Sequence, residues 1–161
     1  MAFVSVYLGL GSNLGDRRKN IERALALLDE GFGCHYTALS RLIETKAWGF
    51  KGDKFLNACV LYRIYRKGGS PEEQGHAVLA LCKEVERALG REDAPEYDAD
   101  GRRVYHNRTI DIDILFYGKE RIDTDDLQVP HPLIGERDFV KIPLAEIAKP
   151  SLKAAFPEYF A

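Results

Sequence analysis

The chain has 161 residues, of which 45% are hydrophobic and 30% are charged. A chain of this length can bury a core without disulfides or metals, and its composition excludes a disordered tail. Lys and Arg total 23 and Asp and Glu total 25, so the formal net charge is -2. This balance argues against a general nucleic-acid-binding protein, which would carry a basic surplus.

The chain carries three cysteines, Cys34, Cys59 and Cys82, without a Cys-x-x-Cys spacing. An odd number is a poor basis for a disulfide framework or a zinc site, so we expect a reducing compartment. The apolar runs are far shorter than the ~20 residues that a membrane span needs. Because no basic segment precedes the first apolar stretch, we expect a strand there, not a signal peptide, and a cytoplasmic protein without membrane contact.

Three strands and a helix are predicted in the first half of the sequence. Residues 3–10 mix β-branched, aromatic and apolar side chains, which predicts a largely buried strand. Apolar residues at three- and four-residue spacing predict an amphipathic helix over 16–30. Residues 36–45 and 55–65 are rich in strand formers and are predicted as the second and third strands, joined by a loop.

The second half begins with a well-marked helix. The segment K-G-G-S-P-E-E contains a cap residue, a proline at the first helical position and a capping-box glutamate, which predicts a helix over 71–89. Residues 91–107 are polar and predict a long loop, and the strict alternation of 108–116 predicts a strand. An apolar stretch follows at 139–148, and we expect the last residues to form a loosely held tail.

The order of these elements is β-α-β-β-α-β, the ferredoxin-like arrangement of one antiparallel sheet with two helices. No internal repeat or linker divides the sequence. We therefore expect a single domain of the α+β class over residues 1–161.

The segment N-R-T-I-D-I-D-I-L carries the clearest chemical signal. Because side chains alternate along a strand, Asp111 and Asp113 are expected on one face, roughly 7 Å apart at Cα. Two close carboxylates repel each other unless cations neutralise them, and oxygen ligands favour hard ions such as Mg²⁺. The alternative is the solvated polar face of a half-exposed strand, and the spacing alone does not exclude it.

Arginines lie near this pair in the sequence. Arg91 follows the second predicted helix, and Arg108 lies three residues before Asp111. Guanidinium groups match phosphate oxygens, so arginines beside a metal-binding pair suit a polyphosphate. Ion pairing at the surface remains an equal alternative for both, and it is favoured for Arg102 and Arg103, whose loop also carries acids.

Two further motifs are ambiguous. His131 in V-P-H-P is held by a stiff backbone, which suits a ligand contact or a role in loop packing. The glycine-rich turn at 11–16 matches neither of the common phosphate-binding glycine motifs. A tight turn is the simpler interpretation, with Ser12 or Asn13 as the candidate cap of the helix.

Together these segments resemble the 6-hydroxymethyl-7,8-dihydropterin pyrophosphokinase family of folate biosynthesis. The similarity runs through Y-L-G-L-G-S-N-L, F-L-N-A, E-R-A-L-G-R, R-T-I-D-I-D-I-L, V-P-H-P and P-L-A-E-I-A. It implies the transfer of an intact diphosphate group from ATP to the pterin hydroxymethyl oxygen, with release of AMP. It also implies two Mg²⁺ ions and a three-layer α/β/α variant of the ferredoxin-like fold. We expect a monomer whose partners are these two small molecules, with no nucleic acid.

The resemblance also implies the residues of the site. Asp111 and Asp113 would bind the magnesium ions, and Asp111 would lie nearer the pterin. With Arg91 and Arg108, which would stabilise the transferring phosphates, they form the expected catalytic set. The implied ATP-binding residues are Glu86, Arg91, Arg108, Ile114, His131 and Arg137, and the implied pterin-binding residues are Thr45, Trp48, Phe55, Asn57, Tyr105, Asp111 and Phe139.

The sequence departs from the family pattern at three points. The usual W-G-P-R reads Y-H-N-R from Tyr105 to Arg108, T-P-x-x-G reads T-K-A-W-G, and Pro132 replaces a common tyrosine. Tyr105 can still cover the pterin ring. We expect these changes to affect affinity and the closing of loop 91–107 over the site, and to leave the reaction unchanged.

Two other functions fit parts of the pattern: a different two-carboxylate enzyme such as a nucleotidyl transferase, and a non-catalytic ligand- or RNA-binding module. The balanced charge and the V-P-H-P segment argue against the first. The paired aspartates give the sheet face the wrong charge for RNA, which argues against the second.

Overall fold

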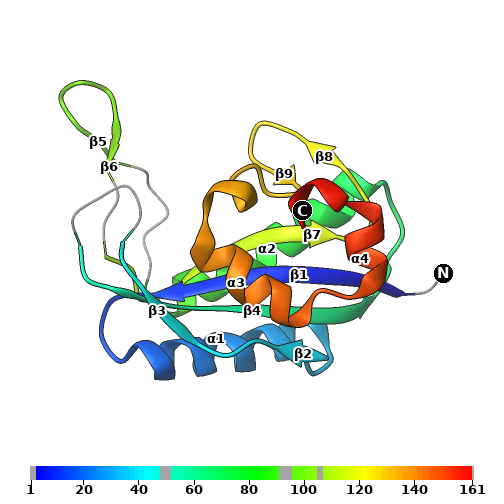
Figure 1. The fold of residues 1–161 in the computed structure, drawn as a ribbon, viewed down its shortest axis with the longest axis horizontal. Helices are drawn as coiled ribbons and strands as arrows, with labels where there is room; N and C mark the ends of the chain where they lie inside the picture. The colour runs from blue at the N-terminus through cyan, green and yellow to red at the C-terminus, as the bar shows by residue number, and fades with distance from the viewer. Residues whose placement is uncertain (1–2, 48–51, 91–95, 105–106, 161) are drawn as a thin grey trace.

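The computed structural model describes residues 3–47, 52–90, 96–104 and 107–160. It is a mixed structure of strands and helices (Figure 1). The elements are β1 (Phe3–Ser12), α1 (Arg17–Phe32), β2 (Ala38–Leu39), β3 (Ile43–Thr45), β4 (Phe55–Tyr65), α2 (Pro71–Ala88), β5 (Glu96–Tyr97), β6 (Arg103–Val104), β7 (Asp111–Tyr117), β8 (Ile122–Asp123), β9 (Gln128–Val129), the 3-10 turn η1 (Ile134–Glu136), α3 (Asp138–Ile147), α4 (Pro150–Ala155) and η2 (Pro157–Tyr159).

The main sheet is antiparallel and has the strand order β2-β4-β1-β7, with β3 pairing beside β2 on the same edge of β4. Two short pairs, β5–β6 and β8–β9, lie outside it. Because β4 and β7 both run antiparallel to β1, they begin at the end of the sheet where β1 finishes. This is the left-hand end in Figure 1.

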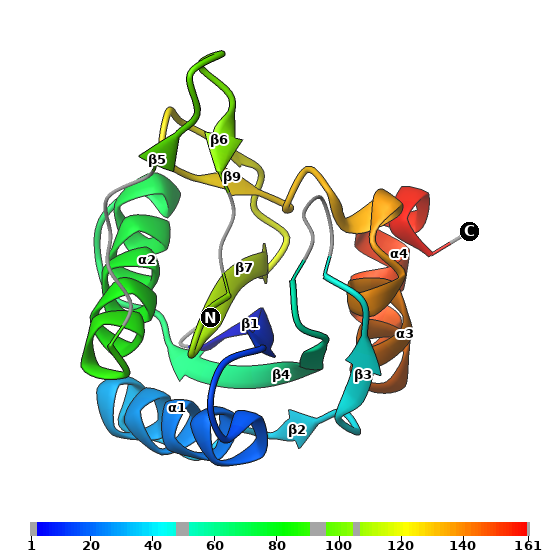
Figure 2. The same cartoon turned by 90° about the vertical axis from the view of Figure 1, so that its left-hand side faces the viewer.

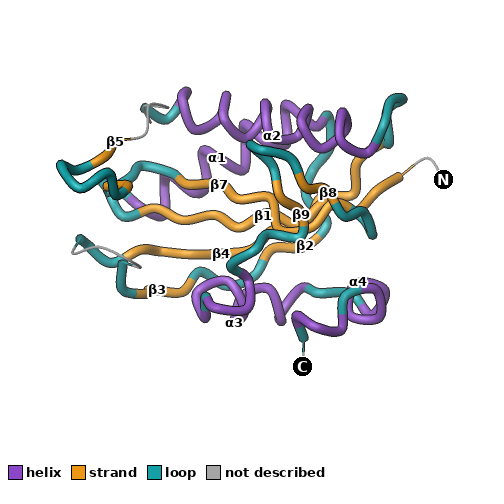
Figure 3. Tube along the Cα trace, turned by 90° about the horizontal axis from the view of Figure 1, so that it is seen from above, coloured by secondary structure: helices purple, strands orange, loops and turns teal. Residues whose placement is uncertain are grey.

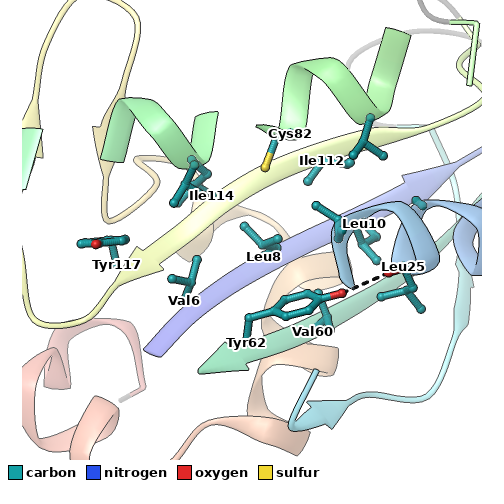
Figure 4. Packing of buried hydrophobic residues seen from close by; sticks show 14 of the residues in the cluster. Val6, Leu8, Leu10, Leu25, Val60, Tyr62, Cys82, Ile112, Ile114 and Tyr117 are labelled. Carbon is teal, nitrogen blue, oxygen red and sulfur yellow. Dashed lines mark hydrogen bonds between the residues drawn. The ribbon is translucent and has the colours of Figure 1, made fainter. Parts of the chain in front are cut away.

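Helices cover both faces of the sheet. Figures 2 and 3 show α1 and α2 on one face and α3 and α4 on the other. The alternation of β1 divides the core accordingly: Val6 and Leu8 face α1 and α2, whereas Tyr7 packs in the core on the α3 side. Figure 4 shows the first of these cores, in which the hydroxyl of Tyr62 donates to the carbonyl of Leu25 at 3.3 Å.

The predicted alternation of the last strand is confirmed in its first part. Ile112 and Ile114 are buried against α2 (Figure 4). Asp111 and Asp113, which alternate with them, lie on the other face. The pairing with β1 then shifts register by one residue, which leaves Leu115 as an extra residue. Leu115 and Phe116 consequently both enter the core beside α3 and α4.

Three predicted boundaries are wrong. Residues 36–45 form two short strands, because the segment holds one residue more than β4 between its two paired stretches. Across this gap the hydroxyl of Ser40 accepts the hydrogen bond from the Cys59 amide at 2.8 Å, in place of a carbonyl of a neighbouring strand. The predicted loop 91–107 contains the hairpin β5–β6, and the strand predicted from 108 begins at Asp111.

The C-terminal segment is also not a loose tail. The helix α4 and the turn η2 place Leu152 and Phe156 in the second core, where the ring of Phe156 lies 5.2 Å from that of Phe116. None of the helices that the structure describes combines the length and the apolar character of a membrane span.

Candidate active site

A pocket opens on the α3 side of the sheet, at the end where β1 finishes and β4 and β7 begin. Gly9 and Gly11 of β1 form its floor. In the register of the sheet, Gly11 pairs with Asn57 of β4 on one side and with Asp111 of β7 on the other. Gly9 and Gly11 are alternate residues on the face of β1 that lines the pocket. Because neither has a side chain, space is left open over β1, and residues from both neighbouring strands can contact one bound molecule.

The β7 side of this pocket is ionic. Asp111 and Asp113 both line it, as the alternation predicts. Arg108 lies 3.4 Å from a carboxylate oxygen of Asp111, and Arg137 lies 3.5 Å from one of Asp113. Both carboxylates are about one-third exposed, and face the pocket. Each acid thus lies against an arginine at the pocket, which favours a binding site over a merely solvated strand face.

The donor set of this pair suits Mg²⁺. Within the described ranges no group of three or more His, Cys, Asp and Glu side chains could hold a metal by itself. Magnesium is commonly bound through one or two carboxylates, with substrate phosphates and water completing its shell. Asp111 and Asp113 offer such a pair of carboxylates on one face of β7, so the residues fit a magnesium–nucleotide complex.

His131 lies behind the ionic side, next to Asp113. Its backbone amide donates to the carbonyl of Leu115 at 3.0 Å, and its Nδ1 accepts from the amide of Leu133 at 3.2 Å. Burial, and then the positive charge of Arg137, lower the pKa of His131 to about 4, against an opposing effect of Asp111. The ring is therefore neutral near pH 7, and Nε2, 3.9 Å from Asp113, carries the proton. It can donate a hydrogen bond to an anionic oxygen without adding charge.

The β4 side of the pocket is aromatic and amide-bearing. Phe55 of β4 and Phe139 of α3 line it, together with Val140. Asn57 is 5% exposed, and its Nδ2 donates to the hydroxyl of Thr45 at 2.5 Å. Rings of this kind bind a flat heterocycle by stacking, and a fixed amide reads the edge of such a ring. The pocket thus joins a site for a flat ring to a site for a polyanion.

Comparison with known proteins agrees with this geometry. The sequence model of the 7,8-dihydro-6-hydroxymethylpterin-pyrophosphokinase (HPPK) family matches residues 7–149. The chain belongs to the HPPK family. It is 41% identical over 145 residues to the 2-amino-4-hydroxy-6-hydroxymethyldihydropteridine pyrophosphokinase of Porphyromonas gingivalis, covering 89% of this chain and 90% of that one. The enzyme of the same name from Aquifex aeolicus is 40% identical over 144 residues, covering 89% and 79%.

A solved structure of an HPPK-DHPS protein in complex with substrates has the same fold, with a TM-score of 0.66. The sequence identity is 13%, so this likeness concerns the fold alone. The match covers 99% of this chain and 44% of that one, so the chain spans less than half the length of the solved structure.

The pocket brings together most of the residues that the resemblance to the HPPK family implies. Thr45, Phe55, Asn57, Arg108, Asp111, Asp113, Arg137 and Phe139 all line it, and His131 contacts Asp113 from outside the lining. Trp48, Arg91 and Tyr105 lie outside the described residues. The grouping of side chains from five separate segments at one end of the sheet is consistent with one active site.

Two of the implied residues lie on the other face of the sheet. Ile114 is 4% exposed and points into the core against α2, because it alternates with Asp113 along β7 (Figure 4). Glu86 of α2 is 6% exposed, and its carboxylate accepts a hydrogen bond of 2.8 Å from the amide of Ile112. Neither side chain lines the pocket. Glu86 instead ties α2 to the strand that carries the aspartates.

Sequence reasoning did not assign three features of the site. The sequence places Gly9 in the first predicted strand and Gly11 in a turn, without a role in the site, and Lys46 lines the pocket where the family pattern has a proline. Asn13 was a candidate helix cap, but the cap is Asp16, whose side chain accepts from the Lys19 amide at 3.1 Å. The replacement of the family's proline by Lys46 could be seen in the sequence. The contacts of Asn13 could not, because its partners lie far away in the sequence.

Proposed function

We propose that the protein transfers the diphosphate group of ATP to 6-hydroxymethyl-7,8-dihydropterin and releases AMP, as a step in tetrahydrofolate biosynthesis. The hydroxymethyl oxygen attacks the β-phosphorus, the bond from that phosphorus to the oxygen of the α-phosphate breaks, and the hydroxyl proton is released. The observation that carries this proposal is the two-part pocket. Asp111 and Asp113 lie against arginines on one side, and Phe55 and Asn57 offer a ring and an amide on the other.

The pterin occupies the aromatic side in this proposal. Phe55 and Phe139 hold the two faces of the ring, and Asn57 hydrogen-bonds its edge in an orientation that Thr45 fixes. Trp48 and Tyr105 are assigned here from the family pattern. Because Gly11 pairs with both Asn57 and Asp111, the carboxylate nearest to the ring is that of Asp111. It is placed to orient the hydroxymethyl group and to accept its proton.

The nucleotide occupies the ionic side. Arg108, Arg137 and the neutral Nε2–H of His131 face the position of the phosphates, and Arg91 joins them by the family pattern. Phosphoryl-group transfer depends chiefly on positioning and on neutralising charge, which is what these groups supply. Glu86 and Ile114 line the other face of β7, so we propose that they support the nucleotide site by holding this strand in place.

Two Mg²⁺ ions are part of the proposal, with Asp111 and Asp113 as their protein ligands. When bound, such ions neutralise the phosphate oxygens and favour the charge that develops on the attacking and leaving oxygens. Arg108 and Arg137 already lie against the same carboxylates. These arginines therefore fix the two side chains in an orientation that faces the substrates.

The decisive experiment is a nucleotide product assay with the purified protein, Mg²⁺, ATP and the hydroxymethyl dihydropterin. We expect AMP as the nucleotide product, and Asp113→Asn should reduce turnover by at least about a hundredfold because one metal ligand loses its charge. The matched control is Asp123→Asn, which changes an exposed carboxylate on β8 and should leave turnover unchanged. Formation of ADP, or full activity of Asp113→Asn, would contradict the proposal.

Three further properties are part of the proposal. The strand order β2-β4-β1-β7 supports a ferredoxin-like fold. Cys59 and Cys82 pack in the cores on opposite faces of the sheet and are free thiols, which supports a reducing, cytoplasmic location. We also propose that the protein acts as a monomer, because one copy of the chain supplies both the aromatic and the ionic side of the pocket.

A further inference from the structure

Asn13 is a buried amide at the point where β1 ends. Asn13 is only 2% exposed, although polar residues in turns usually face water. Its backbone amide donates to the carbonyl of Arg108 at 3.0 Å, and its Oδ1 accepts from the amide of the same residue at 2.6 Å. Its Nδ2 donates to the carbonyl of Asp53 at 3.0 Å and to Oδ1 of Asn107 at 2.8 Å.

These bonds join three segments that are far apart in the sequence. Asp53 lies two residues before Phe55, in the segment that leads into β4, and Asn107 and Arg108 lead into β7. Asn107 adds two bonds of 3.2 Å to Asp53, one to its backbone amide and one to its carboxylate. The turn after β1 and the starts of β4 and β7 meet at one end of the sheet, on the left of Figure 1.

The position of Arg108 depends on this contact. The regular pairing of β1 with β7 stops at Gly11 and Asp111, so Arg108 lies three residues outside the ladder. Asn13 binds both the amide and the carbonyl of Arg108, as a neighbouring strand would, but uses its side chain for one of the two bonds. The guanidinium of Arg108 then reaches Asp111 in the pocket.

A purely local role does not account for the burial of Asn13. Asp16 caps α1, and Asn20 donates to the carbonyl of Leu14 at 2.8 Å and to the hydroxyl of Ser12 at 3.3 Å. The turn is therefore stabilised from inside by other residues. Among the described residues, the side-chain bonds of Asn13 all go to the segments that carry Arg108 and lead into Phe55.

We propose that Asn13 is a positioning residue for the diphosphate transfer, because it fixes the backbone of Arg108 and ties the segment before Phe55 to the same point. The inference rests on the proposed function. Asn13 acts through two chemically separate contacts: its Oδ1 holds Arg108 on the nucleotide side, and its Nδ2 holds Asp53 on the pterin side. The side-chain carbonyl of Asn13 thus positions the nucleotide side of the site, and its NH₂ group positions the pterin side.

The test compares Asn13→Ala with Asn20→Ala, a matched loss of a side-chain amide that α1 directs at the same turn. We expect Asn13→Ala to lower kcat by about tenfold or more, since displacing one phosphate-binding group costs that much. In an Arg108→Ala background, Asn13→Ala should lower kcat by less than about twofold, because the guanidinium that Asn13 positions is already absent. Asn20→Ala should stay within about twofold of the unsubstituted protein. Equal effects of the two asparagine variants, or full additivity with Arg108→Ala, would overturn the proposal.

A second arm does not depend on turnover. The Arg108 amide donates to a buried oxygen, so its hydrogen exchange should be slow, should become at least about tenfold faster in Asn13→Ala and should stay slow in Asn20→Ala. Asn13→Asp keeps the Oδ1 acceptor but loses the donors, so it should retain Arg108 protection and most of kcat while the KM for the pterin rises. Unchanged Arg108 exchange in Asn13→Ala would overturn the positioning role, whereas absence of AMP from the unsubstituted protein would overturn the proposed function alone.

Discussion

Gly11 shows at the scale of one residue how the floor of the pocket is made. A Cβ on Gly11 would lie 2.9 Å from Oδ1 of Asn57 and 3.3 Å from the ring of Phe55, both closer than ordinary contacts. Asn57 is buried and bonded to Thr45, so it cannot move away without losing that bond. A Cβ on Gly9, which faces the same pocket, would meet only Leu115 at an ordinary distance of 3.6 Å.

Gly11→Ala is therefore expected to destabilise the protein by about 1–3 kcal/mol, the usual cost of forcing extra volume into a packed site. Gly9→Ala should cost less than about 1 kcal/mol, because its methyl group fits and alanine orders a strand better than glycine. Urea unfolding of both variants measures the difference. Equal midpoints for the two would mean that Asn57 and Phe55 adapt freely, and that the floor does not require glycine at position 11.

Site residues were predictable to the extent that local geometry sets them. Asp111 and Asp113 share a face because strand alternation has a period of two, and the structure confirms that prediction. The same rule places Ile114 on the opposite face, although the resemblance alone assigned it to the nucleotide. Asn13 could not be assigned, because its partners lie 40 and 94 residues away and only the folded sheet brings them together.

At the scale of elements, the sequence predicted best the segments that carry their own start and stop signals. The capping box of α2 is present, with the Glu73 amide donating to the Ser70 hydroxyl at 3.1 Å, and the helix lies within one residue of its predicted bounds. The short strands β2 and β3 were merged, because the extra residue between them is defined only against β4. The strands β8 and β9 have two residues each, which is too short to show a periodic pattern in the sequence.

The hairpin β8–β9 is joined to α2 by a pH-sensitive contact. His76 of α2 lies 2.7 Å from the carboxylate of Asp126 and 2.7 Å from the carbonyl of Glu72, and the hydroxyl of Thr124 lies 3.4 Å away. The hydrogen bond to Asp126, followed by that to Glu72, raises the pKa of His76 above its ordinary value of 6.5. The same contact lowers the pKa of Asp126 below 3.8, so this carboxylate is ionised throughout the range in which His76 titrates.

These pKa shifts determine how the stability of the fold changes with pH. A histidine with a raised pKa in the folded state stabilises the fold fully below pH 6.5, and the contribution disappears as pH rises through the higher folded value. We expect His76→Gln to lower the Tm at about pH 5.5, and this effect should fade as pH rises above the raised folded pKa of His76, where the imidazole becomes neutral. Thermal unfolding across this range measures it. A Tm difference that is constant with pH would mean that the charge of His76 does not contribute.

The whole molecule consists of a sheet covered on both faces, with a separate core on each (Figure 3). The core beside α1 and α2 follows from the periodicity of two long helices and was predictable. The other depends on the C-terminal segment, whose elements have only six and three residues and gave no periodic signal. The interpretation of that segment as a loose tail was wrong because its apolar residues pack in the core that contains Phe116, which the β7 register shift turns to this face of the sheet.

Phe156→Ala tests whether this segment stabilises the sheet. Phe156 is 1% exposed and packs on Phe116, so truncation should cost about 3–5 kcal/mol through lost burial and a cavity. Glu158→Ala in the neighbouring turn removes an exposed ion pair with Arg121 and should shift the unfolding midpoint far less. Urea midpoints of the two variants give the comparison. If Phe156→Ala costs no more than Glu158→Ala, the C-terminal segment does not support the strand that carries Asp111 and Asp113, and the second core ends at α3.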